Sequence, residues 1–230
     1  MSEKKEIIHK DLVIKNTTVE GVKDKYITNI TIPEGITKIA DNAFSGLYAL
    51  EEIEFPTTLV SIGDYSFRKC SSLKRLVLPE SLCEIGEYSF AECQQLVLVD
   101  LSKTAIKVIP EDAFRECRKL EEIIFSTSLR EIEASAFSHC QSLKNLNLPD
   151  GILGVKDSFL GCELDSISIP DSLRYIESIS YRKVKSRHLL DKNQNYKNAI
   201  FYNLLNIVPL FELMASPPKH HNTTPLSLDL

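Results

Sequence analysis

Apolar and polar residues alternate along the chain in a pattern that returns about every 23 residues. From Leu50 the chain reads LEEIEFPTTLVSIGDYSFRKCSS, and from Leu73 it reads LKRLVLPESLCEIGEYSFAECQQ. Each unit opens with apolar residues at alternate positions, which is the pattern of a short β-strand with one buried face. A proline often follows and ends the strand, because proline has no N–H to give to a ladder.

The remainder of each unit predicts a turn followed by a short helical segment. The stretch Ser81–Gly86 is expected to turn the chain, and Tyr88–Cys93 places a phenylalanine and a cysteine on one side of a helical turn. The same aromatic column recurs at Phe44, Phe67, Phe90, Phe114, Phe137, Phe159 and Tyr181. Seven units follow from this column, so the sequence predicts a repeat solenoid.

The units must stack, because a single unit cannot bury enough apolar surface to offset the entropy of ordering its backbone. We expect a leucine-rich-repeat solenoid over residues 27–184, with short parallel strands on one face and turns or short helical segments on the other. Both ends need caps. Residues 1–26 are predicted to form an N-terminal cap built on a strand or hairpin, residues 185–215 a C-terminal helical cap, and residues 216–230 a disordered tail.

The opening L-x-x-I-x-[IL]-P and the closing I-G-x-x-[AS]-F-x-x-C resemble the BspA-like leucine-rich repeats of bacterial surface antigens. The resemblance runs over about Ile27–Val184, with phenylalanine and cysteine at fixed offsets in most units. It implies a solenoid of leucine-rich repeats, in a family whose members are mostly surface adhesins or uncharacterised interaction proteins. A fold of this kind does not by itself determine the ligand.

Composition and charge exclude some classes of function. The formal net charge is -5, which argues against a protein that binds nucleic-acid phosphates. No run approaches the roughly 18 apolar residues that a membrane span needs, and the first ten residues lack the apolar core of a secretory signal. The sequence as written predicts a cytoplasmic chain. A cell-surface or secreted location is the alternative, if the N-terminus is incomplete or export is unconventional.

Five of the six cysteines recur at intervals of 23, 24, 23 and 22 residues, at Cys70, Cys93, Cys117, Cys140 and Cys162. A column along a solenoid presents sulfur atoms in a line, whereas a zinc site needs four ligands that converge on one point. We therefore interpret the column as buried, reduced packing residues. The histidines match no metalloprotease or nucleophile motif, and we expect no cofactor, no metal and no enzymatic activity.

The outward strand positions differ between units, so any binding specificity is expected there. The candidate protein-binding residues are Glu52, Arg75, Val77, Val97, Leu98, Glu122 and Ile124. Their apolar members are expected to form a contiguous patch with the charged members at its rim, which is the composition of a binding-site core. The other interpretation is that these residues merely suit exposed strand positions. The pairs Glu51–Lys74 and Glu121–Lys144 are expected to stabilise the sheet across neighbouring strands.

The sequence therefore predicts a non-enzymatic protein–protein interaction scaffold and does not identify its protein partner. The alternative is a cell-surface adhesin or antigen that binds host or matrix proteins. Glycosylation at the sequons of Asn16 or Asn29 would favour that alternative. A basic cluster beside an apolar stretch also offers peripheral membrane contact through residues 182–215. The loss of the period after Val184 fits a truncated family member as well.

Overall fold

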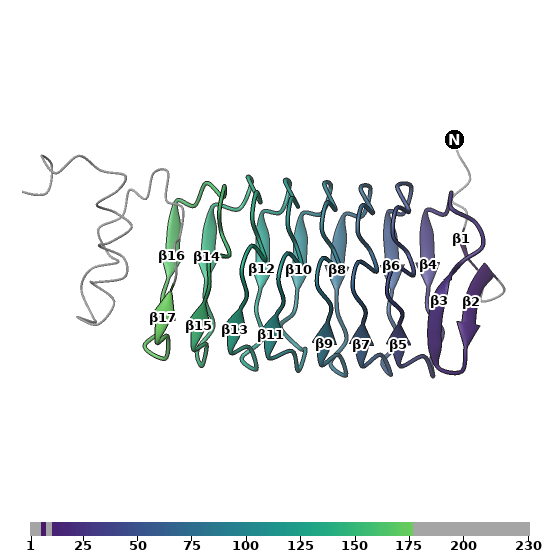
Figure 1. Cartoon of the computed structure of the whole chain (residues 1–230), viewed down its shortest axis with the longest axis horizontal. Coiled ribbons are helices and arrows are strands. Elements are labelled where there is room, and N and C mark those ends of the chain that lie inside the picture. The colour runs from purple at the N-terminus through teal and green to yellow at the C-terminus, as the bar shows by residue number, and fades with distance from the viewer. Residues whose placement is uncertain (1–5, 8–10, 177–230) are drawn as a thin grey trace, which may run out of the picture.

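Each repeat contributes two short strands, and the equivalent strands of successive repeats lie side by side along one axis (Figure 1). The computed structural model describes residues 6–7 and 11–176. Over this part of the chain the predicted solenoid of leucine-rich repeats is confirmed. The segments opposite the strands are turns, and no α-helix occurs in residues 11–176, so the short helical segments that we expected there are absent.

Seven three-residue strands form the first row, which we call row I. The central residue of each strand points inward and is apolar, whereas its two neighbours point outward. Row I consists of β4 (Asn29–Thr31), β6 (Glu52–Glu54), β8 (Arg75–Val77), β10 (Leu98–Asp100), β12 (Glu122–Ile124), β14 (Asn145–Asn147) and β16 (Ser166–Ser168).

Seven two-residue strands form a second parallel row, row II, which the sequence pattern did not predict. The stretch Ser81–Gly86, expected to be only a turn, contains one of them. Each strand except β15 buries only its second residue, so no alternation is long enough to be seen in the sequence. Row II consists of β5 (Lys38–Ile39), β7 (Ser61–Ile62), β9 (Glu84–Ile85), β11 (Val108–Ile109), β13 (Glu131–Ile132), β15 (Gly154–Val155) and β17 (Tyr175–Ile176).

A hairpin covers the N-terminal end of the solenoid. Strands β2 (Leu12–Lys15) and β3 (Thr18–Val22) pair antiparallel, and β3 then pairs in parallel with β5. Strand β1 (Glu6–Ile7) extends row I by pairing with β4. The hairpin buries Leu12 and Val19 against the first repeat. The predicted C-terminal cap, the tail and the predicted membrane contact through residues 182–215 lie outside the described residues.

A stack of six phenylalanine rings runs through the core. Neighbouring rings have centroids 5.0 to 5.4 Å apart, and the four pairs from Phe67 onward lie within 5° of parallel. All six side chains are at least 99% buried. The stack consists of Phe44, Phe67, Phe90, Phe114, Phe137 and Phe159. Each of the four inner rings is stacked on the ring of the repeat before it and on that of the repeat after it, so the stack couples the repeats into one core.

The cysteine column lies beside the phenylalanine stack and joins successive repeats. Each thiol donates to the carbonyl oxygen of the phenylalanine in the preceding repeat, over 3.1 to 3.3 Å. Burial raises the pKa of the Cys70 and Cys117 thiols to about 12. Burial likewise raises the pKa of Cys93 and Cys140, whereas a hydrogen bond with Cys140 lowers the pKa of Cys162. The cysteine column therefore consists of hydrogen-bonded packing residues, and burial keeps its first four thiols protonated.

The glycine of the I-G motif makes room for the preceding repeat. A Cβ added at Gly63 would lie 2.2 Å from Oδ1 of Asp41 and 2.6 Å from the backbone nitrogen of Asp41. That same Oδ1 accepts a hydrogen bond of 3.0 Å from the backbone N–H of Asp64. Gly86 stands in the same relation to Asp64 in the next repeat. The motif thus encodes a contact between neighbouring repeats.

Candidate protein-binding groove

The strand ladder of row I is open at two places. Pairing joins β4 to β6, β8 to β10 and β12, and β14 to β16. Among the described residues, no pairing joins β6 to β8 or β12 to β14. Row I is therefore a series of three short sheets, and each junction between them exposes structure that a continuous ladder would cover.

The two strands that precede the open junctions are the two that end beside a phenylalanine. Phe55 follows β6 and Phe125 follows β12, whereas the same column elsewhere holds the smaller Ile32, Leu78, Leu101, Leu148 and Ile169. Both rings are half-buried and meet the core stack edge-on, with centroids 5.9 Å from Phe67 and 6.1 Å from Phe137 respectively. We attribute the open junctions to the size of these rings.

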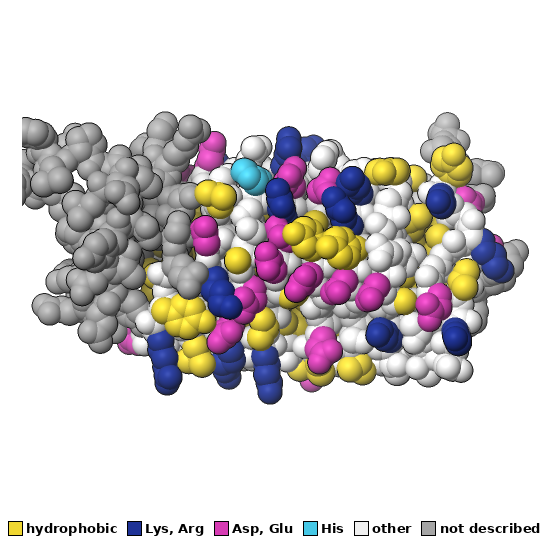
Figure 2. Space-filling view, viewed as in Figure 1, with side chains coloured by type: hydrophobic (Ala, Val, Ile, Leu, Met, Phe, Trp, Pro, Cys, Tyr) yellow, Lys and Arg dark blue, Asp and Glu magenta, His cyan; other side chains and the backbone are white. Residues whose placement is uncertain are grey.

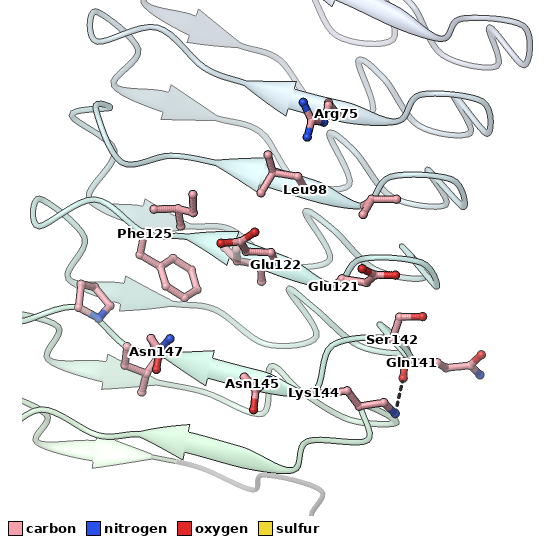
Figure 3. Close-up of a pocket in the computed structure, with 15 residues that line it drawn as sticks. Arg75, Leu98, Glu121, Glu122, Phe125, Gln141, Ser142, Lys144, Asn145 and Asn147 are labelled. Carbon is pink, nitrogen blue, oxygen red and sulfur yellow. Dashed lines mark hydrogen bonds between the residues drawn. The ribbon is translucent and has the colours of Figure 1, made fainter.

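The junction between β12 and β14 lies beneath an open groove of about 1160 Å³ (Figure 3). Four consecutive strands of row I contribute to it, from β8 to β14. Apolar lining comes from Val97, Leu98, Ile123, Ile124, Phe125, Leu148 and Pro149, and polar lining from Arg75, Glu121, Glu122, Gln141, Ser142, Lys144, Asn145 and Asn147. A lining that combines apolar and polar side chains in this way is the composition of a recognition site.

Five of the seven predicted site residues line the groove, namely Arg75, Val97, Leu98, Glu122 and Ile124. The other two, Glu52 on β6 and Val77 on β8, are exposed on the same face but do not line it. The sequence pattern did not predict the contribution of β14 and of Leu148, which follows it. The phenylalanine at position 125, in a column that holds isoleucine or leucine everywhere except here and at Phe55, is the sequence signal nearest to the groove.

The expected contiguous apolar patch is wrong in one respect, because a carboxylate interrupts it. The strand register places Asp100 directly between Val77 and Ile124. Likewise Leu98 lies between Arg75 and Glu122. The outer residues of β10 are therefore one apolar and one acidic side chain. The alternation of Leu98 and Asp100 about the buried Val99 is visible in the sequence.

The charges along the groove differ in whether they are paired. Arg75, Glu121 and Glu122 make no ion pair and no side-chain hydrogen bond with any residue that the structure describes. Asp100 accepts a hydrogen bond of 2.9 Å from the backbone N–H of Ser102. Three charges of two signs thus stand unpaired beside the apolar floor, at the place where an incoming ligand would meet them.

The two predicted cross-strand ion pairs had different outcomes. Lys74 contacts Glu51 at 2.7 Å, as predicted, and its hydrogen bond to Glu51 raises the pKa of Lys74 above its ordinary value. Lys144 instead contacts Glu163 at 3.0 Å, so the predicted pair with Glu121 is wrong. The repeat from Leu143 is two residues short, and Glu163 alone separates its cysteine from the next leucine, where the repeats before it have two residues.

Beyond the groove, the described residues offer neither a metal cluster nor a membrane span. On the face that Figure 2 shows, hydrophobic side chains are scattered singly or in small groups among charges of both signs. No group of three or more histidine, cysteine or acidic side chains is placed to hold a metal ion within residues 6–7 and 11–176. Nor does that part of the chain contain a helix long and apolar enough to cross a bilayer.

The family follows from comparison with known repeat sequences. The model of the BspA type leucine-rich repeat region matches residues 22–109 and 107–210, in six copies. The chain belongs to the BspA-type leucine-rich repeat family. Its family supports a role in interaction rather than catalysis, and leaves the partner open. None of the curated proteins matches the chain.

Solved structures of bacterial leucine-rich repeat proteins share this fold. The leucine-rich repeat protein of T. pallidum is 23% identical, with a TM-score of 0.74, over 86% of this chain and 96% of that one. A leucine-rich repeat protein of Eubacterium ventriosum is also 23% identical, with a TM-score of 0.63, over 81% of this chain and 54% of that one. At this level of identity the likeness shows the fold alone.

Proposed function

We propose that this BspA-type protein is a non-enzymatic scaffold that binds a protein partner through the groove between β8 and β14. The observation that carries the proposal is the groove at the unpaired junction between β12 and β14, where Ile123, Phe125 and Leu148 are part of the lining. The unpaired charges beside it supply the polar rim. Protein interfaces combine a desolvated apolar centre with such a rim, and the solenoid holds both on a rigid row of strands.

A binding experiment with matched variants tests this function. The full chain, immobilised at low density, is exposed to lysate of its source cell, and the retained proteins are compared between wild type and Leu98→Asp. Val60→Asp is the control, because Val60 is 44% exposed and lies beside row II, away from the groove. Circular dichroism and urea unfolding serve to check that all three proteins are folded alike.

We expect wild type and Val60→Asp to retain the same protein and Leu98→Asp to lose it. A buried carboxylate without a partner costs several kcal/mol at a desolvated contact, so the loss should be at least about a hundredfold in affinity. A folded Leu98→Asp protein that still retains the partner would place the interaction elsewhere. Val77→Asp separates the groove from the wider predicted patch, since Val77 lies outside the groove and its substitution should leave binding intact.

The cytoplasm is the compartment that we propose for this interaction, and an exposed free thiol supports it. Cys83 is exposed and unpaired by any disulfide, which suits a reducing compartment. The surface adhesin remains the second candidate, favoured by Asn16, a sequon asparagine exposed in the hairpin turn between β2 and β3. Sensitivity of the native protein's electrophoretic mobility to an N-glycosidase would decide for the adhesin, and insensitivity together with cytoplasmic fractionation for the scaffold.

A further inference from the structure

We infer that the groove selects an extended peptide segment of defined charge polarity. In that segment an apolar residue lies two positions from an acidic residue on one side and two positions from a basic residue on the other. The inference rests on the proposed function, because it concerns the same groove, and it adds the chemistry of the partner. Three outward side chains in register carry it: Arg75, Leu98 and Glu122.

The spacing of these three side chains suits an extended chain that crosses the strands. Neighbouring strands lie about 4.8 Å apart, so Arg75 and Glu122 stand about that far to either side of Leu98. In an extended peptide, side chains on one face recur every two residues, at roughly 6.7 Å. The difference of about 2 Å lies within the reach of the long, flexible arginine and glutamate side chains.

The charges require both signs in the ligand. Arg75 on β8 and Glu121 and Glu122 on β12 have no ion pair among the described residues, so each end of the groove offers its full charge. An acidic residue beside Arg75 and a basic residue beside the two glutamates would both be attracted. A peptide with two basic residues would place one of them beside Arg75, and a peptide with two acidic residues would place one beside the glutamates. The repulsion weakens binding in both cases, so the groove selects a peptide with one charge of each sign.

The groove also offers uncommitted hydrogen-bonding groups for a peptide backbone. The side-chain amide of Asn147 makes no hydrogen bond with any other residue of the described structure. Beside it, Oδ1 of Asn145 accepts a hydrogen bond of 2.7 Å from Ser166, which leaves the amide N–H groups of Asn145. These two side chains lie on β14, across the open junction from Glu122 (Figure 3). They can anchor the main chain of a segment whose side chains face Leu98 and the charges.

A selection from displayed random nine-residue peptides tests the inference on the full chain. The baits are wild type, Leu98→Asp, Arg75→Glu and Glu122→Lys, and Val60→Asp is the control on the other row. We expect wild type and the control to enrich an apolar residue with an acidic residue two positions away on one side and a basic residue two positions away on the other. Arg75→Glu should instead enrich peptides with a basic residue at both of these flanking positions. Glu122→Lys should enrich peptides with an acidic residue at both.

Synthetic peptides then give the magnitude. A mixed-charge peptide should bind wild type about tenfold more tightly than its doubly basic or doubly acidic counterpart, as expected from one attraction exchanged for one repulsion near the surface. The Arg75→Glu protein should reverse the preference between the mixed and the doubly basic peptide. Such a reversal shows direct contact, which a general loss of stability would not produce.

The other outcomes overturn the inference in distinguishable ways. Wild type could enrich an apolar residue without any charge preference at the positions two residues away, and Leu98→Asp could lose that enrichment. This result would overturn the charge polarity and leave the proposed function standing. Failure of wild type to enrich any motif would overturn the peptide ligand. Concentration-dependent dimerisation of wild type, abolished by Leu98→Asp in sedimentation, would assign the groove to a second copy of this chain. If Leu98→Asp enriches the same peptides as wild type, the groove is not the binding site and the proposed function is overturned.

Discussion

Replacing Phe125 with leucine tests whether this ring holds the groove open. Leucine occupies the same column at Leu78, Leu101 and Leu148, so the substitution restores the residue that other repeats carry there. Where a leucine or isoleucine stands before a junction, the next strand usually pairs, as β8 pairs with β10. We therefore expect β12 and β14 to pair in the variant, the groove to close, and the partner to be lost.

The effect on stability should be small, because two changes oppose each other. The variant loses the edge-on contact between Phe125 and Phe137, at 6.1 Å and 81°, which contributes roughly 0.5–1.5 kcal/mol. Each ladder hydrogen bond gained contributes about 0.5–1.5 kcal/mol. The free energy of unfolding should therefore change by less than about 1.5 kcal/mol. Local protection of the amides of β14 should rise more clearly, by about tenfold for each 1.4 kcal/mol.

Amide hydrogen exchange on Asn145–Asn147, with urea unfolding in parallel, measures both quantities. Phe55→Leu is the matched control, because it removes the equivalent edge-on contact with Phe67, at 5.9 Å and 82°, at the other junction. We expect Phe125→Leu to slow exchange in β14 and Phe55→Leu to leave it unchanged. If exchange in β14 is the same in wild type and Phe125→Leu, the ring is not what separates the strands.

Three further substitutions test the account of the core. Phe90→Ala removes a ring stacked on both sides at 5.1 and 5.4 Å and should cost about 3–5 kcal/mol in urea unfolding. Gly63→Ala should cost about 1–3 kcal/mol, because its Cβ would press on the backbone of Asp41, and a neutral result would refute the explanation of the I-G motif. Burial raises the pKa of Cys70 and Cys117 from 9.0 to about 12, so their contribution to stability is complete below pH 9.0 and declines as the pH rises toward 12. Urea unfolding from about pH 7 to about pH 10.5 should show this decline, and Cys117→Ala should make it shallower.

The main features of the fold could be predicted from the sequence because each repeat buries the same columns. The phenylalanine and cysteine columns recur at fixed offsets, and the structure places them in one continuous core. Row II could not be predicted, because its strands have two residues and all but β15 bury only one of them, as in Glu84–Ile85. The helical segments were expected from the spacing of Phe90 and Cys93. The backbone instead turns through left-handed conformations, at φ of 53° for Tyr88 and 64° for Glu92.

The candidate site could be predicted only in part, because strand register decides which side chains are neighbours. Outward positions such as Leu98 and Glu122 follow from alternation along each strand. That Asp100 separates Val77 from Ile124 follows only from aligning three strands. The position of the groove depends on the half-buried ring of Phe125, whose effect on the ladder no single-strand pattern reveals.

The most direct test of the central claim is a photo-cross-linking experiment that asks where the partner touches the solenoid. A photoreactive benzoyl-phenylalanine is placed at Leu98 in the groove or, in a second protein, at Val108, which is 40% exposed in row II. Both proteins are irradiated in source-cell lysate. We predict a cross-linked partner from position 98 and none from position 108. Cross-linking from position 108 without cross-linking from position 98 would contradict the account and move the binding surface to the other row.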